Sequence, residues 1–156
     1  MDLRKLVTDK EKEQGGVWIT LVDLAGLPTD ARVKVRRLSS GAYRKLAAEK
    51  QISYRHLMGD PETRVEAINR AALDMLVEFI VVGWEGFEVD GVVLEFTPEN
   101  VRAIFGDPQL VTINDQVSAG AGNAANYQAE LTEDLLKNLP RSSSVDSDTP
   151  ATSSAT

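Results

Sequence analysis

The residue types that most often carry catalysis or bind metal ions are scarce in this sequence. Its 156 residues include one histidine, His56, and no cysteine. Nucleophilic triads that use histidine, and the common His/Cys metal sites, therefore lack the side chains they need. His56 lies near the predicted end of a helix, where the helix macrodipole stabilises a surface histidine. We expect His56 to be structural and the protein to be non-enzymatic, with no catalytic residue, no cofactor and no metal site.

Two other patterns could serve binding chemistry, and each falls short of a known motif. Residues 120–124 read Gly-Ala-Gly-Asn-Ala and lack the third glycine and the Gly-Lys-Ser/Thr ending of phosphate-binding loops. We interpret this run as a flexible hinge between two helices, because glycines destabilise a helix interior. Four acidic residues surround a predicted hairpin without the spacing of a calcium loop or a catalytic carboxylate pair. We interpret them as a solvated rim: Glu85, Glu88, Asp90 and Glu95.

The overall charge argues against nucleic acid as a partner. The chain carries 24 acidic and 17 basic residues, for a net charge of −7, whereas duplex binding needs clustered lysine and arginine. The densest basic segment, residues 32–37, alternates with valines in a predicted strand and is typical of a solvated strand face.

The apolar residues predict a buried core but no membrane span. The hydrophobic fraction is 42%, an ordinary value for a globular domain. The longest apolar stretch, around residues 79–82, is far shorter than the roughly 20 residues that cross a bilayer. Residues 1–16 contain no apolar run of signal-peptide length. We expect no membrane partner and a location in the cytoplasm.

Strand patterns occur in two regions. Residues 17–21 are β-branched and aromatic, and residues 32–36 alternate polar and apolar side chains. We expect these two strands to pair in a small antiparallel β element between residues 17 and 36. Residues 87–96 contain Asp90-Gly91, a strong signal for a tight β-hairpin.

Helical periodicity dominates the rest of the chain. Apolar residues recur at helical spacing between Ser40 and Leu57, and Asp60-Pro61 provides a cap and a proline at the first helical position. The helix that follows should lie at the centre of the core. Two further helices should begin at 97–98 and 107–108, and Asn123 could cap a last amphipathic helix. The predicted buried stripe of the central helix is Val65, Ile68, Ala72, Met75, Leu76 and Phe79.

Together these patterns predict a helix-dominated α+β fold with a single domain. Residues 1–16 read as a charged N-terminal arm or a frayed helix, and residues 17–139 as the folded domain. Residues 140–156 are mostly Ser, Thr, Ala and Pro. They cannot bury enough surface to offset the entropy of ordering, so we predict a disordered tail.

Four side chains are candidate partner-binding residues. Trp84 lies among glycines after the long helix and could either fill the core or stand out as an anchor. Most other aromatic residues, Trp18 among them, lie in apolar patterns and are expected in the core. The face of the last helix could fold back on the domain or bind a partner. The candidates are Trp84, Tyr127, Leu131 and Leu135.

The order of these segments resembles that of the tail assembly chaperones of long-tailed bacteriophages. The most specific part of the resemblance is the pairing of Trp-Glu-Gly at 84–86 with Phe-Thr-Pro-Glu-Asn at 96–100. The likeness covers about residues 16–137. Other matching segments are 16–21, 32–36, 43–46, 81–83, 94–95, 115–117 and 125–127.

This resemblance implies a function in the host cell cytoplasm. A chaperone of this kind binds the long, apolar tape measure protein, keeps it soluble, helps to recruit tail tube subunits and leaves before the particle is complete. An acidic body with apolar helix faces is physically suited to this role, and it could also self-associate.

Three alternatives remain open at this stage. The chain could be a structural tail or connector protein that stays in the virion. It could be an enzyme in which Glu85, Glu88 and Lys45 converge in a cleft. It could also be a regulatory adaptor unrelated to phage.

Overall fold

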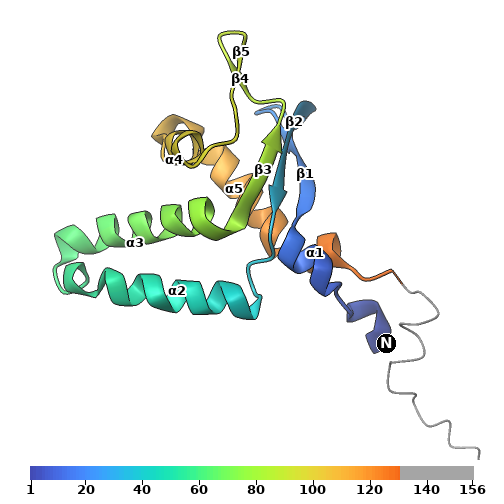
Figure 1. Cartoon of the computed structure of the whole chain (residues 1–156), viewed down its shortest axis with the longest axis horizontal. Coiled ribbons are helices and arrows are strands. Elements are labelled where there is room, and N and C mark those ends of the chain that lie inside the picture. Colours follow the sequence, from blue (N-terminus) through green and yellow to red (C-terminus); the bar gives the residue numbers. More distant parts are fainter. Residues whose placement is uncertain (131–156) are drawn as a thin grey trace, which may run out of the picture.

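A three-stranded antiparallel sheet lies at the centre of the fold in a computed structural model that describes residues 1–130 (Figure 1). Its order is β1 (Val17–Val22), β2 (Pro28–Val35) and β3 (Val81–Glu85). The pairing of β1 with β2 confirms the predicted β element. Strand β3 was not among the predicted strands. Its valines and tryptophan have the high strand propensity that decides the outcome.

Two antiparallel helices extend away from the sheet, α2 (Gly41–Ser53) and α3 (Pro61–Met75) (Figure 1). The predicted start signals are confirmed: the Ser40 hydroxyl accepts a hydrogen bond from the Tyr43 amide, and Asp60 caps α3 ahead of its first-turn proline. Helix α3 continues through one π-helical turn, Leu76–Ile80, directly into β3.

The predicted buried stripe of the central helix is correct only in its second half. Met75, Leu76 and Phe79 are buried, whereas Val65 and Ile68 are exposed, as is Ala72. Polar contacts join α2 and the turn after it to α3 and its continuation. Tyr54 bonds Asp74, Lys50 bonds Glu78, and the Thr63 hydroxyl donates to the Leu57 carbonyl. The C-terminal end of the stripe is packed in the core, where the Phe79 ring lies 5.8 Å from the Tyr43 ring of α2, and the earlier part of the stripe is left exposed.

The predicted hairpin follows β3. Strands β4 (Glu88–Val89) and β5 (Val92–Val93) pair antiparallel. Asp90 and Gly91 both have positive φ, 52° and 77°, which is the geometry of a type I′ turn. Helix α4 (Pro98–Phe105) comes next and is capped by the Thr97 side chain.

Helix α5 (Val111–Gly122) corrects the predicted hinge at residues 120–124, because both glycines of that run lie within the helix. The helix runs through both glycines because Gly120 packs on β1: a Cβ at this position would lie 2.8 Å from Cδ1 of Ile19. Close packing against a strand thus outweighs the low helix propensity of glycine.

The last amphipathic helix is also corrected within the described residues. Asn123 does cap a helix, but this is a short 3-10 helix, Ala124–Tyr127. The chain is then extended, and the Ala129 amide donates to the Val7 carbonyl. Leu131, Leu135 and the predicted tail lie outside the described residues.

The N-terminal segment forms a 3-10 helix, Leu3–Leu6, and the short helix α1 (Lys10–Gly15). Several contacts attach it to the domain. Among them, the Asp9 amide donates to the Tyr127 carbonyl at 2.8 Å, and Glu13 pairs with Arg37.

One face of the sheet packs against the π-helical turn and helices α4 and α5, and this layer forms the core. The fold is therefore the predicted helix-dominated α+β domain with a small antiparallel sheet and a hairpin. The buried core residues include Leu21, Val33, Val35, Met75, Leu76, Phe79, Ile80, Trp84, Val101, Phe105 and Val117.

Candidate functional site

The basic strand residues are engaged within the chain. Arg32 bonds Glu85 at 2.6 Å across the sheet, and its guanidinium lies 4.7 Å from the centre of the Trp18 ring. Trp18 is therefore not in the core as predicted. It lies half-exposed on the open face of the sheet, because its position in β1 points away from the buried layer.

The three side chains of the enzyme alternative are dispersed. Glu85 pairs with Arg32, Glu88 lies in the hairpin, and Lys45 is exposed on α2. Within residues 1–130, no group of three histidine, aspartate or glutamate side chains is placed to hold a metal ion.

One polar cluster was missed by the sequence patterns. Asp74 of α3 accepts hydrogen bonds from the Tyr54 hydroxyl at 2.7 Å and from Arg102 at 3.0 Å, with the Lys50 ammonium 3.6 Å away. Burial opposes the ionisation of Asp74, but these hydrogen bonds and charges outweigh it and hold its pKa below the ordinary value. The cluster joins α2, α3 and α4. Its polar atoms are paired with one another, so we assign it to stability.

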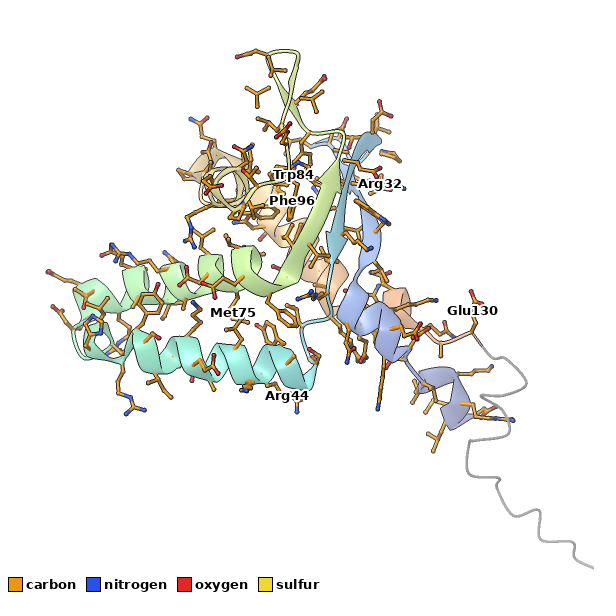
Figure 2. The ribbon with its side chains drawn as sticks, viewed as in Figure 1. Arg32, Arg44, Met75, Trp84, Phe96 and Glu130 are labelled. Atoms are coloured by element: carbon orange, nitrogen blue, oxygen red, sulfur yellow. The ribbon has the colours of Figure 1, made fainter. Side chains whose placement is uncertain are left out.

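Trp84 is buried and holds the base of the hairpin. Its side chain is 7% exposed, and its indole N–H donates to the Leu94 carbonyl at 2.9 Å. The Phe87 and Phe96 rings lie 4.7 and 5.2 Å from the Trp84 ring, and Figure 2 shows Trp84 beside Phe96. Of the two alternatives for Trp84, core or exposed anchor, the structure shows the core: Trp84 positions the hairpin and is too buried to serve as the candidate partner-binding residue.

Tyr127 is also in the interior. Its hydroxyl donates to the Val35 carbonyl at 2.9 Å, and burial raises the pKa of the phenol to about 12. The predicted partner-facing position is corrected because the chain turns inward here instead of continuing as a surface helix. Neither described candidate is therefore exposed, and Leu131 and Leu135 lie outside the described residues.

A different apolar surface lies around the hairpin. Val89, Val92 and Val93 are 51%, 66% and 71% exposed, on a hairpin that projects beyond the sheet (Figure 1). The turn between β1 and β2 adds Leu24 and Leu27, at 92% and 62%. We call these five residues the apolar end. Exposed aliphatic side chains gathered at one end of a domain are typical of interaction sites.

A cavity of about 440 Å³ lies between the two parts of the apolar end. Leu24 and Val89 line it from opposite sides, and Phe87 and Ile113 form part of its wall. A volume of this size accommodates several apolar side chains of a partner.

Two side chains fix the backbone around the cavity. Asp23 accepts hydrogen bonds from the amides of Ala25 and Leu27, both at 2.9 Å, which fixes the β1–β2 turn. Gln116 of α5 bonds both the amide and the carbonyl of Val22. The apolar end is therefore built on a fixed frame rather than on loose loops.

Gly86 sets the position of the hairpin. Its φ is +74°, and a Cβ here would lie 2.5 Å from the Asp30 carbonyl oxygen. Only glycine allows β3 to turn this close to β2.

The sequence contains a signal for this surface that the prediction did not use. Strand alternation places one of two consecutive residues on each face of a hairpin. The pair Val92-Val93 therefore makes both faces apolar, and a two-stranded hairpin cannot bury both of them.

The surroundings of the apolar end are acidic. No lysine or arginine occurs in residues 21–31 or 86–101, whereas these segments contain six carboxylates: Asp23, Asp30, Glu88, Asp90, Glu95 and Glu99. This agrees with the predicted acidic rim at the hairpin.

In the part of the chain that the structure describes, no helix is both long enough and apolar enough to span a membrane.

No curated protein and no solved structure matches the chain. Residues 34–138, more than half of the sequence, match the family of YdaY prophage proteins. The match includes β3, the hairpin, α4 and α5, and it indicates a phage-derived protein. The chain therefore belongs to the YdaY prophage protein family.

Proposed function

We propose that this phage protein is a tail assembly chaperone whose apolar end binds apolar helical segments of the tape measure protein. The observation that carries the proposal is the exposure of five large aliphatic side chains at one end of an acidic domain. Burying apolar surface yields roughly 25 cal/mol per Å², so covering this end with apolar helix is favourable. No catalytic step is part of the proposal.

The charge supports the same role. The whole chain carries a net charge of −7, which keeps complexes apart while their apolar parts are covered. The bound client would stay soluble in the host cell cytoplasm until tail tube subunits, which the chaperone helps to recruit, enclose it.

Co-expression with the tape measure protein tests this function. Replacing Val92 and Val93 with glutamate adds charge where the client should bind, and we expect soluble client to fall to the amount obtained without the chaperone. The matched control is Leu3→Glu with Leu6→Glu, because these leucines are equally exposed, at 70% and 63%, but lie at the N-terminus. The control should keep the client soluble.

Circular dichroism should show that both double variants remain folded. Loss of client solubility with both variants, or with neither, would contradict the proposal. The alternative of a structural tail protein predicts the chain in purified virions by mass spectrometry, whereas the chaperone should be absent from them.

A further inference from the structure

A second surface shares no residue with the apolar end. A groove of about 810 Å³ runs between α3 and the corner that joins α4 to α5. Its apolar residues include Val65, Ala72 and Val111, all of them exposed. Val65 and Ala72 belong to the stripe that the sequence predicted to be buried, so this part of the stripe is an apolar helix face without a cover in the described chain.

The sides of the groove are acidic. Glu62 and Glu66 line it from α3, and Asp107 and Asp115 line it from the opposite side. The one basic side chain in the lining, Arg70, already pairs with Glu66 at 2.5 Å. The groove therefore suits an amphipathic helix with a small apolar stripe and flanking positive charges.

The wall of the groove also contains an unpaired polar atom. The Asn114 amide nitrogen donates to the Phe105 carbonyl at 2.8 Å, while the Asn114 amide oxygen is buried and accepts no hydrogen bond from the described chain. A small rotation of this amide would offer the oxygen to a donor seated in the groove.

A helix with the required properties is present in the same chain. On the side of α2 away from α3, Ala48 and Ile52 lie one helical turn apart and are exposed. Arg44, Lys45 and Arg55 flank them, and all three are exposed. Arg44 is seen on this outer side of α2 in Figure 2.

We infer that the chain self-associates head to tail, with the outer face of α2 from one copy seated in the α3–α5 groove of the next. The two surfaces are different parts of the molecule, so each bound copy leaves one groove and one α2 free, and the contact can repeat. This inference does not depend on the apolar end or on the identity of its client.

Charge reversal tests the contact through two variants of the full chain. The groove variant is Glu62→Lys with Asp115→Lys, and the helix variant is Arg44→Glu with Lys45→Glu. In sedimentation experiments, the mean mass of the native chain should increase with protein concentration. Added salt should lower this mean mass. Each variant alone should associate at least about tenfold more weakly, a loss of about 1.4 kcal/mol.

Mixing the two variants provides the decisive result. The helix variant keeps an intact groove and the groove variant keeps an intact α2, so an equimolar mixture should form heterodimers. The free groove and free helix of such a dimer also carry opposite charges, so the comparison is with each variant alone: the mixture should associate at least about tenfold more strongly than either variant by itself.

Matched controls carry the same charge changes elsewhere: Glu11→Lys with Glu99→Lys, and Lys5→Glu with Lys10→Glu. All four side chains are exposed and lie outside both surfaces, so these variants should associate like the native chain. A native chain that stays monomeric would overturn the inference. So would association that both variants preserve, or a mixture that fails to form heterodimers.

Discussion

At the scale of single residues, Asp74 shows how a buried charge is accommodated in this fold. Its carboxylate would be costly to bury alone, but Tyr54, Arg102 and Lys50 supply donors and positive charge from two other helices. The cluster therefore fixes α2 and α4 to α3. Removing the charge should weaken all three contacts together.

Asp74→Asn should lower the free energy of unfolding by about 1.5–3 kcal/mol at neutral pH, the range for hydrogen bonds to a charged group. Denaturant titration measures this value. The matched control is Glu78→Gln, which removes a more exposed partner of Lys50 and should change stability by no more than about 0.5 kcal/mol.

The difference in unfolding free energy between the native chain and Asp74→Asn should depend on pH. The pKa of Asp74 is lowered in the folded state, so its contribution is complete above the unfolded value of about 3.9. It is lost as the pH falls through the folded pKa. The stability difference between native chain and Asp74→Asn should therefore narrow below about pH 4, and a constant difference down to pH 2 would contradict this assignment.

The residue scale is also where prediction from sequence was weakest. Trp84 could be read as core or as anchor because its partner, the Leu94 carbonyl, lies across the hairpin and approaches only once the hairpin forms. The Asp74 cluster was invisible for the same reason, since its members come from three helices. Single-sequence patterns record spacing along the chain, whereas these contacts depend on which elements meet.

At the scale of elements, local signals were reliable wherever the two interacting groups lie close together in the sequence. The caps of α3 and α4 and the Asp90-Gly91 turn were predicted and are present. A helix after Asp107-Pro108 was predicted, but its continuation through Gly120 and Gly122 was not, because Gly120 packs on β1, about 100 residues earlier in the chain. Gly120 permits that contact.

The substitution Gly120→Leu should therefore destabilise the protein, even though leucine favours helices. The side chain would displace Ile19 on β1, and overpacking of this kind costs about 1–3 kcal/mol. The matched control is Gly122→Leu, because a Cβ at this position meets only Leu38, at 3.8 Å. This control should change the free energy of unfolding by no more than about 0.5 kcal/mol. Thermal unfolding of both variants checks this. Equal stability of the two would refute the packing role of Gly120.

At the scale of the whole molecule, two kinds of surface are separated on one rigid frame. The hairpin of the apolar end projects past the sheet (Figure 1). The acidic groove lies between α3 and the corner that joins α4 to α5. Composition predicted the acidic, helix-rich domain. It did not locate the apolar surface, because that location depends on where the hairpin lies relative to the sheet. The contacts of Trp84 with Phe87 and Phe96 fix the base of the hairpin.

Site-specific photo-crosslinking tests the central claim most directly. A photoreactive residue replaces Val92 at the apolar end or, in a second protein, Leu3 at the N-terminus, and each is irradiated in cells that also produce the tape measure protein. The account predicts a crosslink to the tape measure protein from position 92 and none from position 3. A tape measure protein that remains uncrosslinked at position 92, or that crosslinks equally at both positions, would contradict it.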